Sequence, residues 1–131
     1  MRIRSLHHVS IMVSDLKRAE EFYCDLLGLK SLPRPQRLVE GLWLAAGNTQ
    51  LHLIVGRVDP APAVEERKVL ERVGVARHFA LAVTDVHAAA EFLEQRGQPP
   101  LGSVIERPEG AASVFLRDPD GNLVELIQFA A

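Results

Sequence analysis

The chain has 131 residues, 47% of them apolar and 24% charged, which suits a single domain that fills its own hydrophobic core. A net charge of −2 disfavours a nucleic-acid partner, and no apolar stretch approaches the length of about 18 residues that a membrane span needs. Cys24 is the only cysteine and the N-terminus has no apolar signal core, so we expect a cytoplasmic protein without an internal disulfide.

The first half of the chain predicts a strand, a helix and three further strands. Apolar and polar residues alternate over 6–13, which is the period of a strand with one buried face. Ser14 and Asp15 provide helix N-cap groups, apolar residues then recur at helical spacing to Leu27, and Gly28 provides a stop. Less regular strands are expected near 29–33, 38–45 and 49–55.

A linker is expected over 57–76, because Pro60 and Pro62 interrupt regular structure near its start. Within it, the stretch AVEERKVLERV is expected to form a short helix. The second half then predicts a strand that begins at His78 and a helix that ends at Gly97. Its last strands are expected near 103–107, 111–117 and 122–129, with a DPDG turn between the final two.

The two halves of the chain repeat one another. HVSIMVSDLKRAEEF (8–22) aligns without a gap with HFALAVTDVHAAAEF (78–92), and six of the fifteen positions are identical. GNTQLHLI (47–54) matches GNLVELI (121–127), which is one residue shorter, so that His52 corresponds to Glu125. Two matches in the same order predict an α+β fold of two repeated βαβββ modules, 1–56 and 77–131, within a single domain. We expect a cupped mixed sheet with the helices outside.

Four potential metal ligands occupy corresponding positions of the two repeats. Each lies on a predicted strand, opposite the apolar residues that a helix would cover, so all are expected on the concave face of the sheet. Imidazole and carboxylate ligands suit Zn²⁺, Ni²⁺, Co²⁺, Mn²⁺ or Fe²⁺. Any one of these residues taken alone has a structural alternative, and their joint placement predicts one divalent metal ion. The four are His8, His52, His78 and Glu125.

Other side chains are expected around this site. Segment 33–41 is predicted to border a cleft, with Arg34 and Arg37 as substrate-binding groups. Trp43 and Phe115 are candidate apolar walls for a small substrate, although Trp43 packing under the sheet is an equal alternative. His7 is expected to face away from His8 and to be structural.

Three segments resemble the vicinal oxygen chelate superfamily: HHVSIMVSDLKRAEEFYCDLLGL (7–29), HFALAVTDV (78–86) and FLRDPDGNLVELI (115–127). That superfamily includes glyoxalase I, methylmalonyl-CoA epimerase, fosfomycin-resistance thiol transferases, extradiol dioxygenases and bleomycin-sequestering proteins. By this resemblance, His8, His78 and Glu125 match the family's metal ligands. His52 stands where glyoxalases and epimerases usually have Glu or Gln. Three neutral imidazoles and one carboxylate would leave the site formally +1, which makes the metal a stronger Lewis acid.

The resemblance implies a metal-dependent, glyoxalase I-like lyase or isomerase in which Glu125 moves a proton. A strict glyoxalase I is disfavoured, because that enzyme has an Arg and an Asn four residues beyond its first two ligands, where this chain has Met12 and Gly56. The enzyme alternatives are a fosfomycin-type thiol transferase and an extradiol dioxygenase, although His52 would crowd the open Fe²⁺ positions that a dioxygenase needs. The non-enzyme alternative is a bleomycin-type binding protein, although such proteins lack the metal ligands.

The resemblance also implies a homodimer. Exposed strand edges and an open concave face need a cover, which either the second module of the same chain or the complementary module of a partner can supply. Related small proteins usually take the second route. His8 and His52 would then come from one chain, and His78 and Glu125 from the other.

Overall fold

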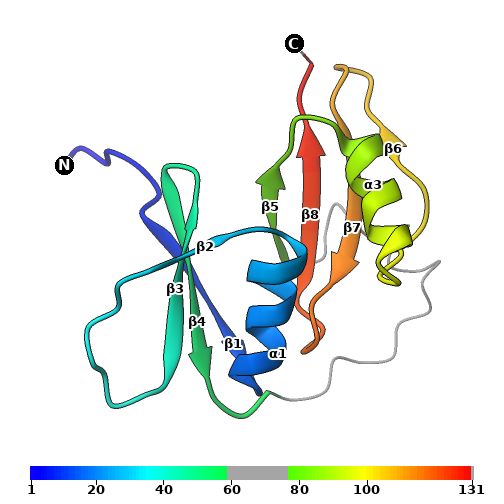
Figure 1. The fold of residues 1–131 in the computed structure, drawn as a ribbon. Coiled ribbons are helices and arrows are strands. Elements are labelled where there is room, and N and C mark those ends of the chain that lie inside the picture. The colour runs from blue at the N-terminus through cyan, green and yellow to red at the C-terminus, as the bar shows by residue number, and fades with distance from the viewer. Residues whose placement is uncertain (59–76, 131) are drawn as a thin grey trace. The chain divides into compact units, whose positions relative to one another are not determined.

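The computed structural model of this protein describes residues 1–58 and 77–130 (Figure 1). The chain divides into two compact units, 1–59 and 60–131. Each unit holds one four-stranded sheet with a helix packed against it. The linker helix expected within 57–76 lies outside the described residues. No helix in the described ranges is long and apolar enough to cross a membrane.

The first unit is a mixed sheet in the strand order β1-β4-β3-β2. Strand β1 runs parallel to β4, whereas β3 is antiparallel to both of its neighbours. The parallel pair requires a crossover, and the helix provides part of it. The elements are β1 (His8–Val13), helix α1 (Leu16–Glu20), the π-helical segment η1 (Glu21–Leu26), β2 (Lys30–Leu32), β3 (Gly41–Ala46) and β4 (Thr49–Val55).

The helix of the first unit starts where the sequence predicts but changes pitch. The Asp15 carboxylate accepts the backbone N–H of Arg18 at 3.1 Å, as an N-cap residue does. In η1 the hydrogen bonds widen, and the Leu27 N–H donates to the carbonyl of Phe22, five residues earlier, at 3.0 Å. The helix packs against β4, and Phe22 and Tyr23 are buried.

The second unit has the same architecture, in the order β5-β8-β7-β6, with β5 parallel to β8. The prediction of two repeated βαβββ modules is therefore confirmed. Helix α3 packs on β7 and β8, and buries Val86 and Leu93. The elements are β5 (His78–Ala82), α3 (Val86–Gln95), β6 (Ile105–Glu106), β7 (Ala112–Arg117) and β8 (Leu123–Gln128).

The predicted DPDG turn joins β7 to β8 and is organised by one buried carboxylate. Asp118 is 5% exposed, and its Oδ1 accepts the backbone N–H groups of Asp120 at 2.9 Å and Asn122 at 2.8 Å. Its Oδ2 accepts from Nδ2 of Asn122 at 2.7 Å. Gly121 has a φ of 85°, a conformation that favours glycine. This turn fixes the register that places Glu125 on β8.

Two predicted strands are shorter than expected, for local reasons. The strand expected over 38–45 begins only at Gly41, because the Val39 carbonyl accepts from the Arg34 guanidinium at 2.7 Å and closes a loop. The strand expected over 103–107 is reduced to Ile105–Glu106. There the N–H of Arg107 donates to the Ala111 carbonyl at 2.8 Å, which begins the turn into β7.

Candidate functional site

In the first unit, the structure brings two of the predicted ligands into contact. His8 is paired with Gln50 across the parallel β1–β4 ladder, and Ser10 is paired with His52, so the two histidines are diagonal neighbours on one face. Their rings stack with centroids 4.0 Å apart and planes 12° from parallel. The two predicted ligands are therefore direct neighbours on this sheet face.

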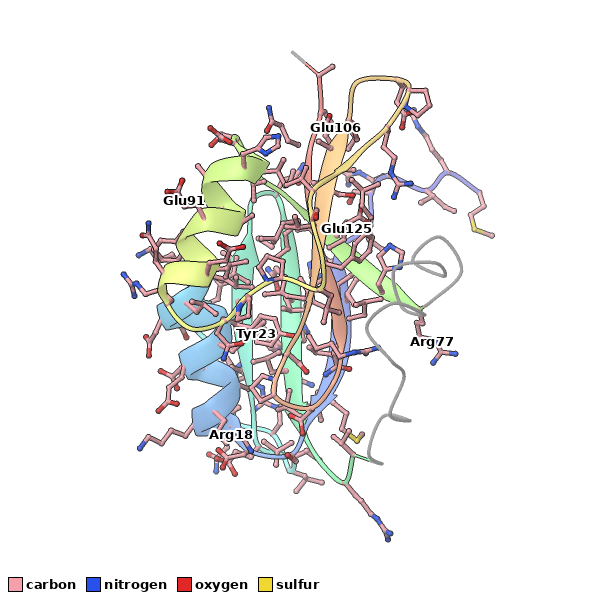
Figure 2. All side chains as sticks on the ribbon, turned by 90° about the vertical axis from the view of Figure 1, so that its right-hand side faces the viewer. Arg18, Tyr23, Arg77, Glu91, Glu106 and Glu125 are labelled. Atoms are coloured by element: carbon pink, nitrogen blue, oxygen red, sulfur yellow. The ribbon has the colours of Figure 1, made fainter. Side chains whose placement is uncertain are left out.

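The second unit brings the other two predicted ligands together at the same register. His78 is paired with Leu123 and Ala80 with Glu125, which repeats the diagonal of the first unit. Nε2 of His78 lies 3.0 Å from Oε2 of Glu125. Figure 2 shows Glu125 on β8 of this unit. Each unit therefore contributes one pair of potential ligands at equivalent positions.

The His52 ring is held on both faces. Trp43 is its partner on β3 and stacks on it with centroids 4.5 Å apart and planes 9° from parallel. Because β1 and β3 flank β4 on opposite sides, His8 and Trp43 cover opposite faces of the ring. Nε2 of His52 lies 2.8 Å from Oε1 of Gln50, which accepts if that nitrogen carries the proton. The ring is thus fixed in one orientation, and Nδ1 retains the lone pair.

Burial and neighbouring groups favour the neutral form of this ring. His52 is only 7% exposed. Burial lowers the pKa of the imidazole, and nearby positive charges lower it further. A neutral imidazole is the form that binds a metal. The neighbouring groups are His8, His7, Arg34 and Arg37.

The prediction that His7 faces away from His8 is wrong. Nδ1 of His7 lies 2.8 Å from Nδ1 of His8, and the two rings meet edge to face with centroids 5.1 Å apart. His7 precedes the first residue of β1, so the alternation of a strand does not apply to it. A hydrogen bond between the two Nδ1 atoms leaves Nε2 of His8 as the nitrogen for a ligand.

The predicted substrate-binding residues of the first unit surround Trp43. The guanidinium carbon of Arg37 lies 5.6 Å from the centre of the Trp43 ring, within the range of a cation–π contact. The Arg34 guanidinium lies against Gly41, two residues before Trp43 on β3. Trp43 is half-buried, so it combines packing with partial exposure, and neither of the two predicted alternatives describes it fully.

Phe115 has the position in the second unit that Trp43 has in the first. It is paired with Glu125 across β7 and β8, as Trp43 is paired with His52. It is 1% exposed and clusters with Leu123, and its ring meets His78 edge to face with centroids 5.5 Å apart. Phe115 therefore packs against a predicted ligand and orients it.

The donors of the two pairs fit a divalent transition metal. His52 is stacked between two rings, and Glu125 is 8% exposed and faces Nε2 of His78 at 3.0 Å. No group of three or more His, Cys, Asp or Glu side chains gathers as a metal site within either described range. Gln50 and His7 are contacts of the ligands that the sequence did not predict. The contact between Gln50 and His52 could have been predicted from one feature of the sequence, because Gln50 lies two residues before His52 and so on the same face of the strand.

Known proteins are similar to this chain in sequence. A sequence profile of the Glyoxalase/Bleomycin resistance protein/Dioxygenase superfamily matches residues 5–126. Human mitochondrial methylmalonyl-CoA epimerase is 30% identical over 131 residues, covering 94% of this chain and 73% of that protein. A lactoylglutathione lyase of Arabidopsis thaliana is 31% identical over 133 residues, covering 95% of this chain and 44% of that protein.

Solved structures share the fold. A glyoxalase/bleomycin resistance protein/dioxygenase from Alicyclobacillus acidocaldarius is similar with a TM-score of 0.70 and 26% identity, covering 100% of this chain and 96% of that chain. The fosfomycin resistance protein FosX of Listeria monocytogenes has a TM-score of 0.73 at 16% identity, covering 98% and 96%, which is a likeness of fold alone. The profile match spans the elements of both units, and the chain belongs to the Glyoxalase/Bleomycin resistance protein/Dioxygenase superfamily.

Proposed function

We propose that this protein is a metal-dependent lyase or isomerase of the glyoxalase I type, acting on a small substrate that chelates the metal through neighbouring oxygens. The observation that carries the proposal is the repeated diagonal, in which His8 and His52 of one sheet correspond to His78 and Glu125 of the other. Two relatives near 30% identity are an epimerase and a lactoylglutathione lyase, which supports proton-transfer chemistry here.

The four residues would hold one Zn²⁺, Ni²⁺, Co²⁺, Mn²⁺ or Fe²⁺ ion. When bound, such an ion supplies Lewis acidity that stabilises negative charge on a substrate oxygen. Nδ1 of His52 and Nε2 of His8 are the free nitrogens of the first pair, given the contacts with Gln50 and His7. The second pair offers a nitrogen of His78 and the carboxylate of Glu125.

Glu125 is the proposed base. A carboxylate keeps lone pairs that ligation does not use, whereas a neutral imidazole has only one basic nitrogen. In the proposed reaction, a Glu125 oxygen takes a proton from a substrate carbon and returns it to the neighbouring carbon. In the structure, Nε2 of His78 lies 3.0 Å from Oε2 of this carboxylate, so the two groups already face one another. The low exposure of Glu125 limits exchange of the proton with water.

The protein is not expected to bind a glutathione-containing substrate in the way that glyoxalase I does. At the two positions where that enzyme has Arg and Asn, the Met12 side chain lies over Gly56. A Cβ atom on Gly56 would come within 2.9 Å of the Met12 sulfur, so the glycine makes room for the thioether. This apolar patch offers no partner for a carboxylate. Arg34, Arg37 and Trp43 remain the proposed substrate-binding residues, whereas Phe115, which is 1% exposed, would act by packing against His78.

We also propose a homodimer in which each metal takes one ligand pair from each chain. Dimers of this superfamily supply the precedent, and the separation of the ligand pairs into two units is compatible with it. Metal affinity would then depend on assembly, because neither pair alone completes the site.

The experiment is a turnover assay with a panel of hemithioacetals, epoxides and catechols, using metal-loaded protein. Glu125→Gln keeps an oxygen ligand but cannot carry the proton, and its turnover of the best hemithioacetal should fall at least about a hundredfold. Glu91→Gln is the control, since Glu91 is exposed on α3 (Figure 2). A Glu125→Gln protein that retains metal and turns over at the wild-type rate would exclude Glu125 as the base.

A further inference from the structure

Two arginine side chains share the sheet face of His8 and His52. Gly41 and Trp43 are two residues apart on β3 and so lie on the same face, and Trp43 stacks on His52 there. A Cβ atom on Gly41 would come within 3.2 Å of Nη2 and 3.3 Å of Cζ of Arg34. The Arg34 guanidinium therefore lies against Gly41 beside the ligand pair, and the atom nearest to such a Cβ is the backbone carbonyl oxygen of Leu53.

Arg37 extends the same array. Its guanidinium lies over Trp43 at 5.6 Å, Trp43 stacks on His52, and His52 stacks on His8. Four planar groups thus form a column that ends in a cation, with a second cation at Gly41. The column holds Arg37 near the ligand pair although its own loop position is exposed.

Both guanidinium groups lack an acidic partner in the part of the chain that the structure describes. Arg34 uses Nη2 to donate to the Val39 carbonyl, and its buried Nε has no hydrogen-bond partner. A buried N–H group without a partner is costly, and it is unusual unless a ligand completes it.

We propose that Arg34 and Arg37 form an anion subsite beside His8 and His52, which holds a carboxylate or phosphate group of the substrate. A guanidinium presents a planar fork of donors that matches the paired oxygens of either group. The substrate class is then a small oxygen-chelating compound that also carries an anionic group. This assignment of the substrate class rests on the proposed function, because it assumes the neighbouring metal. Anion binding by the subsite itself needs no metal.

The chain carries its own probe for this subsite. Trp43 is the only tryptophan, so protein fluorescence excited at the indole band reports on the residue that Arg37 covers. Metal-free protein would be titrated with glycolate, with methylphosphonate and with ethylene glycol, which present a carboxylate, a phosphonate and no charge. Glycolate or methylphosphonate should change the emission saturably, and the affinity should weaken as NaCl is raised. Ethylene glycol should have no effect.

Charge-removing variants locate the subsite. Arg37→Gln and Arg34→Gln should each weaken binding of the anion about three- to tenfold, as expected for a partly exposed charged contact. Arg18→Gln removes the same charge from helix α1 of the same unit, and should leave the affinity unchanged (Figure 2). Arg34 packs against Gly41, so Arg34→Gln could unfold, which circular dichroism would reveal. The affinity of Arg37→Gln for the anion then tests the subsite alone.

Three results would contradict the anion subsite. Binding of ethylene glycol as tight as that of the anions would overturn the proposal. So would an unchanged affinity in Arg37→Gln, or an equal loss in Arg18→Gln, which would show a general effect of net charge. Metal content, measured separately, distinguishes the two proposals. Anion binding by a protein that never takes up metal would contradict the proposed function alone, and metal uptake without anion binding would contradict the subsite alone.

Discussion

The imidazole ring of His52 stacks on that of His8, with centroids 4.0 Å apart and planes 12° from parallel. This contact joins β4 to β1. Trp43 covers the opposite face of His52, so the ring has little freedom to turn. A ligand held in place before the metal arrives loses less conformational entropy on binding, and this pre-organisation favours tight binding.

Replacing Gln50 should weaken metal binding without unfolding the protein. Gln50 accepts from Nε2 of His52 at 2.8 Å, and so directs Nδ1 toward the metal in the proposed site. Gln50→Leu should lower the affinity for Zn²⁺ about 10- to 100-fold, measured by competition with a chromophoric chelator. Gln95→Leu, at the exposed end of α3, is the matched control. Equal affinities of the two variants would show that Gln50 does not orient the ligand.

Asp118 should be a large contributor to the stability of the second unit. Its buried carboxylate accepts three N–H groups within the turn, and Asp118→Ala would leave them without that acceptor. The free energy of unfolding in urea should fall by about 2–3 kcal/mol. Asp118→Asn keeps one oxygen acceptor and should lose less. The account of this turn is wrong if Asp118→Ala is no less stable than Glu109→Ala, a substitution in an exposed loop.

The thiol of Cys24 should react slowly at mildly alkaline pH. Burial raises its pKa above the ordinary value, and the carboxylates of Glu20 and Asp25 raise it further, against a smaller opposite effect of Lys30. Less thiolate is then present at a given pH, so alkylation by iodoacetamide should need a higher pH than for a free cysteine.

The sign of this effect can be tested with one variant. Glu20→Gln removes a negative charge, lowers the pKa of Cys24 and should speed its alkylation at fixed pH. Glu94→Gln on α3 should leave the rate unchanged, because Glu94 is exposed in the other unit. A Cys24 that alkylates with the pH profile of an unstructured peptide would contradict the raised pKa.

The proposed sharing of ligands between chains predicts complementation. An inactive His8→Ala chain would be mixed one-to-one with an inactive Glu125→Ala chain, then unfolded and refolded together. Half of the dimers would be mixed, and each would hold one intact site of two, so about a quarter of the activity should return. No recovery at all would mean that each site is built within one chain.

Much of the fold followed from the sequence, because the repeat and the strand alternation are local signals. The alternation predicted around His8 and His78 is present in the burial patterns of β1 and β5, where both residues are at exposed positions. The start of β3 was missed because it depends on a side-chain contact, from Arg34 to the Val39 carbonyl, that no propensity encodes.

The contacts around the ligands were the less predictable part of the site. The edge-to-face meeting of His7 and His8 arises before β1 begins, where alternation gives no guidance. The hydrogen bond from His52 to Gln50 depends on the rotamers of both side chains. The spacing along the strand predicts that Gln50 and His52 share a face, but their contact depends on how the surrounding side chains pack.

Metal content is the most direct test of the proposed centre. Purified wild-type protein, incubated with Zn²⁺, Ni²⁺ or Mn²⁺ and desalted, would be analysed by mass spectrometry for bound metal, beside His78→Ala and His87→Ala. His87 is the matched control, because its side chain is 67% exposed on α3. We predict about one ion per chain in the wild type and in His87→Ala, and almost none in His78→Ala. A wild-type protein that retains no ion, or a His78→Ala protein that retains as much as the control, would contradict the metal centre.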